Sequence, residues 1–219
     1  MKLYHGSTVI VSKPLYGHGK PYNDYGQGFY CTEEAELARE WACIDLEGGF
    51  LNSYDFNDSD LKVLELRERK IIEWVALLFS NRVIRYSNPI EKKAADHIIA
   101  KYLPDISGYD VIVGYRADDS YFTYARAFLS NTISLQQLHS SMKLGNLGVQ
   151  VCVKSVKGFE NISFVGAEPV DGEVYFPKRM ERDAGARREY YALLEKNTGS
   201  DIFIRDIIGE EMGLNDFRI

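Results

Sequence analysis

Two short stretches near the start of the chain, LYHGS at residues 3–7 and GQGFYCT at residues 26–32, decide the fold that we expect. The first is an apolar, extended stretch that ends in a histidine, a glycine and a serine. The second is entered through glycines and carries aromatic side chains. Their composition predicts a β-strand for each. An imidazole, an unhindered backbone and a hydroxyl side by side also predict a ligand-binding site where the first strand ends.

The composition is that of a globular protein with one core. The chain has 219 residues, of which 45% are hydrophobic and 26% are charged, which suits a single domain and argues against disorder. Its formal net charge of -6 argues against a general DNA or RNA binder. The densest basic cluster is interleaved with acidic residues, so it predicts a solvated helix face; it comprises Lys178, Arg179, Arg182, Arg187 and Arg188.

Cysteine usage and hydropathy favour a cytoplasmic protein. Cys31, Cys43 and Cys152 form neither a disulfide framework nor a metal-ligand spacing, so we expect reduced thiols and no metal site. The longest apolar run, 74–79, is too short to span a bilayer, and the first residues lack an apolar stretch of signal-peptide length. We therefore expect no membrane contact.

Strand-like and helix-like stretches follow one another irregularly along the chain. Strands are expected at residues 2–5, 28–32, 61–66, 109–114, 149–154 and 162–165, and helices at 33–44, 70–79, 91–102, 120–129, 134–142, 179–196 and 204–212. Because strands and helices do not alternate strictly, the pattern favours an α+β domain with a mostly antiparallel sheet over a doubly wound parallel one. We expect one domain over residues 1–219, with a helical C-terminal extension at about 177–219.

The residue types in and after the two strands suit recognition of nicotinamide joined to ribose. His5 can hydrogen-bond to a ribose hydroxyl, Gly6 allows the backbone to approach a carboxamide, and Ser7 can reach the sugar or the amide. Tyr30 offers an aromatic face for the nicotinamide ring, and Trp41, on the helix that follows, can cover the opposite face. Both aromatic residues could equally be core residues.

These residues resemble the ADP-ribosyltransferase superfamily, whose sites combine a histidine on the first strand, an aromatic residue on the second and an acidic residue on a later one. The chain is similar to a bacterial family of that superfamily that is often encoded beside small partner proteins in toxin-antitoxin-like pairs. The similar pieces are residues 26–32, 41–42, 109–114 and 117–119 and the strand around Gln150. The resemblance implies a split, mostly antiparallel sheet with flanking helices, NAD as co-substrate, a macromolecular acceptor and a small antitoxin-like partner.

The third element of that pattern differs in this chain. Gln150 stands where better-known members of the superfamily carry the catalytic glutamate. A unit charge at about 4 Å and an effective dielectric constant of about 20 is worth on the order of 4 kcal/mol, so its loss could slow the reaction by roughly three powers of ten. Three alternatives remain: Gln150 suffices, Asp118 or Asp119 supplies the carboxylate, or the protein binds the nucleotide without turning it over.

Several other residues have simpler interpretations. Asp118 and Asp119 could merely cap the helix that begins near residue 120. The glycine-containing, aromatic-rich segment 14–25 is either a loop that closes over a ligand or an ordinary surface loop. The expected activity is an NAD-dependent ADP-ribosyltransferase with catalytic residues Gln150, His5 and Tyr30; the alternatives are an NAD glycohydrolase and a catalytically silent module that binds NAD or a partner protein.

Overall fold

The strands of the protein are arranged in two sheets. The computed structural model describes residues 1–117, 119–144, 148–195 and 201–219. Its strands are β1 (Lys2–Ser7), β2 (Phe29–Cys31), β3 (Gly49–Phe56), β4 (Val63–Glu65), β5 (Val111–Tyr115), β6 (Val149–Val153) and β7 (Ile162–Val170). One sheet has the order β1–β3–β7 and the other β2–β6–β5–β4. All neighbouring strands are antiparallel except β4 and β5, which are parallel.

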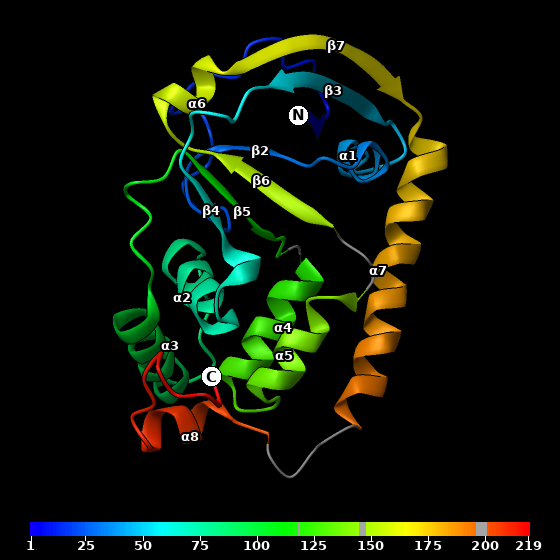
Figure 1. Cartoon of the computed structure of the whole chain (residues 1–219). Coiled ribbons are helices and arrows are strands. Elements are labelled where there is room, and N and C mark those ends of the chain that lie inside the picture. Colours follow the sequence, from blue (N-terminus) through cyan, green and yellow to red (C-terminus); the bar gives the residue numbers. More distant parts are fainter. Residues whose placement is uncertain (118, 145–147, 196–200) are drawn as a thin grey trace.

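Helices cover the four-stranded sheet and connect it to the three-stranded one. They are α1 (Ala35–Ala42), α2 (Ile71–Asn81), α3 (Pro89–Tyr102), α4 (Asp119–Leu129), α5 (Leu135–Ser141), α6 (Val156–Glu160), α7 (Gly172–Leu194) and α8 (Ile204–Gly209), with a short 3-10 helix η1 at Leu66–Glu68. In Figure 1, α2 to α5 lie below the four-stranded sheet, while α7 runs along one side from the β-rich half to the helical half. Within the described part of the chain, no helix is long and apolar enough to cross a membrane.

The two sheets meet where β1 approaches β2. Tyr4 and Thr32 exchange backbone hydrogen bonds of 2.8 and 2.9 Å, and this isolated bridge joins the sheets. Beyond it the strands diverge, and α1 packs against β1 and β3. His5 and Tyr30 lie beside this bridge and contact each other. The junction of the two sheets therefore brings the two expected site segments together.

The main core lies on the helical side of the four-stranded sheet. The segment Ile71–Phe79 of α2 is buried on every side, and Trp74 within it has no exposed surface. A helix that is hydrophobic all round belongs in the interior. The apolar run at 74–79 therefore belongs to the main core, and Trp74 within it donates a 3.2 Å hydrogen bond to Tyr115 O of β5.

The α+β architecture with two mostly antiparallel sheets and flanking helices agrees with the fold class expected from the sequence. The strand β3 is a feature that the sequence does not predict. Its register shifts between Ser53 and Tyr54, which interrupts the alternation of buried and exposed positions on which strand prediction depends. The helix α7 begins earlier than expected, at Gly172, because the Asp171 carboxylate caps it by accepting a 2.9 Å hydrogen bond from Glu173 N.

Candidate functional site

A cavity of about 690 Å³ opens where the two sheets diverge. It is lined by five of the expected site residues: His5 and Gly6 from β1, Tyr30 from β2, Trp41 from α1 and Gln150 from β6. These residues are far apart in the sequence, and the fold brings them to one place. The sixth expected residue, Ser7, is not among the lining residues.

The hydrogen bonding of His5 defines which ring nitrogen can contact a ligand. His5 Nδ1 lies 2.7 Å from the carbonyl oxygen of Tyr30. A carbonyl only accepts hydrogen bonds, so Nδ1 carries the proton and donates. Burial lowers the pKa of His5, which keeps the ring neutral near pH 7 and leaves Nε2 as an acceptor. The ring also packs on Phe29, with centroids 4.7 Å apart.

The Tyr30 hydroxyl is engaged within its own turn. It donates a 2.6 Å hydrogen bond to Gly26 O and accepts one of 3.0 Å from Tyr25 N. The ring stacks on Tyr25, with centroids 6.3 Å apart and planes 18° apart, and burial raises the pKa of the phenol. The hydroxyl therefore stabilises the loop that leads into β2, and the ring contributes an aromatic wall to the cavity.

Gly6 and Ser7 have structural roles that the sequence did not reveal. A Cβ atom on Gly6 would lie 1.8 Å from Ala38 O, so the close packing of α1 on β1 requires glycine there. The Ser7 hydroxyl donates a 2.6 Å hydrogen bond to Val9 O and accepts one of 3.1 Å from Asn52 Nδ2. Ser7 thus helps to hold the turn after β1.

Trp41 lines the cavity, but one face of its indole is covered. The Arg116 guanidinium lies 4.3 Å from the Trp41 ring centroid, a cation–π contact. The ring contacts of the two expected stacking residues therefore go to different partners, Tyr25 for Tyr30 and Arg116 for Trp41. Stacking of nicotinamide between Tyr30 and Trp41 remains a prediction.

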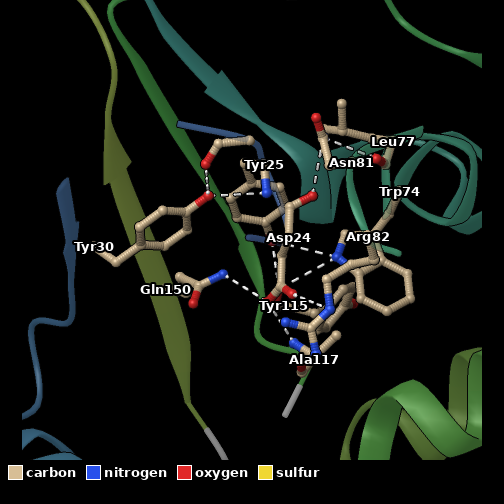
Figure 2. A network of polar contacts seen from close by, with 11 residues as sticks. Asp24, Tyr25, Tyr30, Trp74, Leu77, Asn81, Arg82, Tyr115, Ala117 and Gln150 are labelled. Carbon is tan, nitrogen blue, oxygen red and sulfur yellow. Dashed lines mark hydrogen bonds and ion pairs between the residues drawn. The ribbon is translucent and has the colours of Figure 1, made fainter. Parts of the chain in front are cut away.

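Gln150 contacts the carboxylate of Asp24, a residue that no sequence pattern singles out. Its Nε2 donates a 3.1 Å hydrogen bond to Asp24 Oδ2, and Ala117 N donates one of 2.8 Å to the same oxygen. Figure 2 shows Asp24 at the centre of these contacts, with Arg82 on its other side. Asp24 belongs to segment 14–25, which contributes several residues to the cavity wall: Pro14, Leu15, His18, Gly19, Lys20, Asn23 and Asp24.

The cavity wall carries more positive than negative charge. Its cationic lining residues come from the segment 14–25, the end of α2, the residue after β5 and α7; they are Lys20, Arg82, Arg116 and Arg179. Among the lining residues that the structure describes, one is acidic, Asp24. A surplus of positive charge suits an anionic ligand such as a phosphate ester. Sequence patterns do not indicate this set, since each cation comes from a different part of the chain.

The expectation of a solvated basic face on α7 is wrong for two of its arginines. Arg179 lines the cavity and donates a 3.0 Å hydrogen bond to Cys43 O. Arg182 forms a bidentate pair with the buried Glu40 of α1, with distances of 2.8 and 2.7 Å. Both side chains turn inward because α7 packs against α1, a contact that helical periodicity alone does not reveal.

The remaining candidates resolve as follows. Asp118 lies outside the described residues; Asp119 begins α4, but its side chain is not among those described. The three cysteines are buried and free. Among the described residues there is no cluster of histidine, cysteine and acidic side chains that could hold a metal.

Residues 1–164 match the family described as "Protein of unknown function (DUF3990)". The chain belongs to the DUF3990 family. The matched region contains β1 to β6 and the first three residues of β7. It also contains every cavity residue named above except Arg179 of α7. No curated protein and no solved structure matches the chain.

Proposed function

We propose that this DUF3990 protein is an NAD-dependent ADP-ribosyltransferase that modifies a macromolecular acceptor. One observation carries the proposal: His5, Gly6, Tyr30, Trp41 and Gln150 line a single cavity. These are the residues whose chemistry suits nicotinamide riboside. The cationic side chains around them suit the diphosphate of the same molecule.

The neutral His5 imidazole fits a role in ribose binding. With Nδ1 donating to Tyr30 O, His5 Nε2 accepts a hydrogen bond from a ribose hydroxyl. Gly6 suits the carboxamide. Strand alternation directs the N–H and C=O of Gly6 to the same edge of β1 as those of Tyr4, which pair with Thr32 of the other sheet. Nicotinamide at this edge lies beside the Tyr30 ring.

In the proposed reaction the bond between the nicotinamide nitrogen and the anomeric carbon of ribose breaks. Nicotinamide leaves with the electron pair, and positive charge develops on the sugar. A nucleophile of the acceptor then bonds to the anomeric carbon and loses its proton. Gln150 holds the ribose during this step, and Arg82, Arg116, Lys20 and Arg179 surround the phosphates. The role of a toxin neutralised by a small antitoxin-like protein rests on the resemblance of the sequence alone.

The decisive experiment measures nicotinamide release from NAD by the purified protein, with and without cell lysate, beside Gln150→Ala. Release that requires lysate, and that Gln150→Ala abolishes, is the expected result. Release without lysate would instead indicate an NAD glycohydrolase. NAD binding, seen as a raised melting temperature, without release under either condition would indicate a catalytically silent module.

A second measurement tests the binding site itself. His5→Ala is expected to weaken NAD binding, because it removes the Nε2 acceptor and the ring that packs on Phe29. Calorimetric titration of NAD measures the change. Unaltered affinity in His5→Ala would contradict the placement of nicotinamide riboside beside β1.

A further inference from the structure

Asp24 is a carboxylate that the fold holds inside the cavity wall. The residue is only 4% exposed. Its carbonyl oxygen accepts a 3.2 Å hydrogen bond from Asn81 Nδ2 of α2. The next residue, Tyr25, is completely buried, and its hydroxyl accepts a 3.3 Å hydrogen bond from Trp74 Nε1 and donates to Tyr115 O. A loop residue is thereby fixed against the core (Figure 2).

The two carboxylate oxygens of Asp24 have different surroundings. Oδ2 accepts hydrogen bonds from Ala117 N and Gln150 Nε2. Oδ1 is buried and has no hydrogen-bond partner among the described residues; Arg82 Nε lies 3.6 Å from it, at ion-pair distance. A buried polar atom without a hydrogen bond costs about 1–3 kcal/mol, and in native proteins such atoms call for an explanation.

The contact with Asp24 settles the orientation of the Gln150 amide. A carboxylate accepts hydrogen bonds and does not donate them, so it pairs with Nε2 and not with Oε1. With Nε2 directed to Asp24 Oδ2, Oε1 points away from the carboxylate. Gln150 is only 5% exposed and lines the cavity. Its carbonyl oxygen is thus oriented to accept a hydrogen bond from a sugar hydroxyl.

The charge of Asp24 is not needed for the two hydrogen bonds at Oδ2. The neutral amide oxygen of an asparagine could accept the hydrogen bonds from Ala117 N and Gln150 Nε2 equally well. Ionising a buried carboxyl group is unfavourable, and burial raises the pKa of Asp24 despite the opposing effects of Ala117 N, Arg82, Gln150 and Arg116. A charge that these hydrogen bonds do not require, in the wall of a cavity, points to a role in the reaction.

We propose that Asp24 and Gln150 act as one carboxylate–amide pair, in which Asp24 positions the Gln150 amide and supplies the negative charge that position 150 lacks. This inference rests on the proposed function. Asp24 is a positioning residue that acts through Gln150. As the glycosidic bond breaks, its charge lies one hydrogen bond behind the amide that holds the ribose, and it stabilises the positive charge on the sugar.

The experiment compares steady-state nicotinamide release by the natural protein, Asp24→Asn and the exchanged pair Asp24→Asn/Gln150→Glu. Asp24→Asn keeps the shape and an acceptor oxygen but removes the charge. We expect kcat to fall about 100-fold, as the loss of a charge near the reacting atoms implies, while KM changes by less than about threefold. The exchanged pair again contains one carboxylate and one amide. We expect its kcat to be at least about tenfold higher than that of Asp24→Asn.

Asp110→Asn is the matched control. Asp110 also accepts a hydrogen bond from a backbone N–H, that of Lys62 at 2.8 Å, and from a polar side chain, Ser155, but it does not line the cavity. We expect the Asp110→Asn variant to keep the kcat of the natural protein for nicotinamide release. Thermal unfolding of each variant shows whether it folds.

The outcomes separate this inference from the proposed function. An active natural protein whose Asp24→Asn variant keeps its kcat, or loses activity through KM alone, overturns the pair and leaves the transferase standing. An exchanged pair no more active than Asp24→Asn also overturns it. A natural protein that releases no nicotinamide with or without lysate overturns the proposed function, and the pair with it.

Discussion

Replacing Gly6 with alanine tests how α1 is positioned over the cavity. The new Cβ would lie 1.8 Å from Ala38 O and 2.6 Å from Ala42 N. Both are backbone atoms of α1, so a change of rotamer cannot relieve the overlap. Non-bonded heavy atoms pack at about 3.5 Å, so α1 must move away from β1 by more than about 1 Å. Overpacking of this kind costs about 3 kcal/mol, which lowers the Tm of a domain of this size by roughly 6–12 °C.

The assay is urea and thermal denaturation of Gly6→Ala beside Gly166→Ala. Gly166 lies on β7 of the same sheet, and a Cβ there meets no atom within 4 Å. We expect Gly166→Ala to stay within about 0.5 kcal/mol of the natural protein. Because α1 carries Trp41, Gly6→Ala should also weaken NAD binding. Equal unfolding free energies for the two variants would refute the packing argument.

Three further predictions concern single side chains. Burial raises the pKa of Asp24 above 3.8, so as the pH rises past 3.8 the unfolded state loses this proton before the folded state does. Ionisation of Asp24 therefore lowers the unfolding free energy at pH 7, and Asp24→Asn should raise it. Urea titrations should show no such gain near pH 3.5. Glu40→Gln should lower the unfolding free energy by about 2 kcal/mol in urea, because it leaves the partly buried Arg182 without its carboxylate; a change within error would show that the pair contributes nothing. The chain has 2 tryptophans, so in Trp74→Phe the fluorescence comes from Trp41 alone, and NAD should change it; constant emission during calorimetrically proven binding would place the nicotinamide elsewhere.

The strands that frame the site could be predicted because their apolar residues alternate or form short β-rich runs. β1, β2, β5 and β6 fall within one or two residues of the expected bounds. The strand β3 was missed because its bulge at Ser53/Tyr54 breaks the alternation. The short helix α6 was missed as well; its N-cap is Ser155, whose Oγ accepts a 2.9 Å hydrogen bond from Gly158 N, and five residues are too few to show a helical period.

Part of the candidate site could also be read from the sequence. His5, Gly6, Tyr30 and Trp41 follow from residue type and spacing and Gln150 from the resemblance to the ADP-ribosyltransferase superfamily, and all five line the cavity. Asp118 and Asp119 are the carboxylates that the sequence offers as one alternative, within a stretch that resembles the family. Asp24 was overlooked because it lies in a loop, where no periodic pattern indicates which side chains turn inward.

The sequence by itself determined the elements whose signal is local: strands that alternate, helices with an apolar face, and the histidine, glycine and aromatic residues they carry. Only the tertiary structure decided which distant groups meet. The contact of Asp24 with Gln150 joins residues 126 positions apart, and that of Arg182 with Glu40 joins residues 142 positions apart. Such pairs form because sheets and helices bury their apolar faces together, which brings polar groups from different elements to one cavity and leaves no local trace in the sequence.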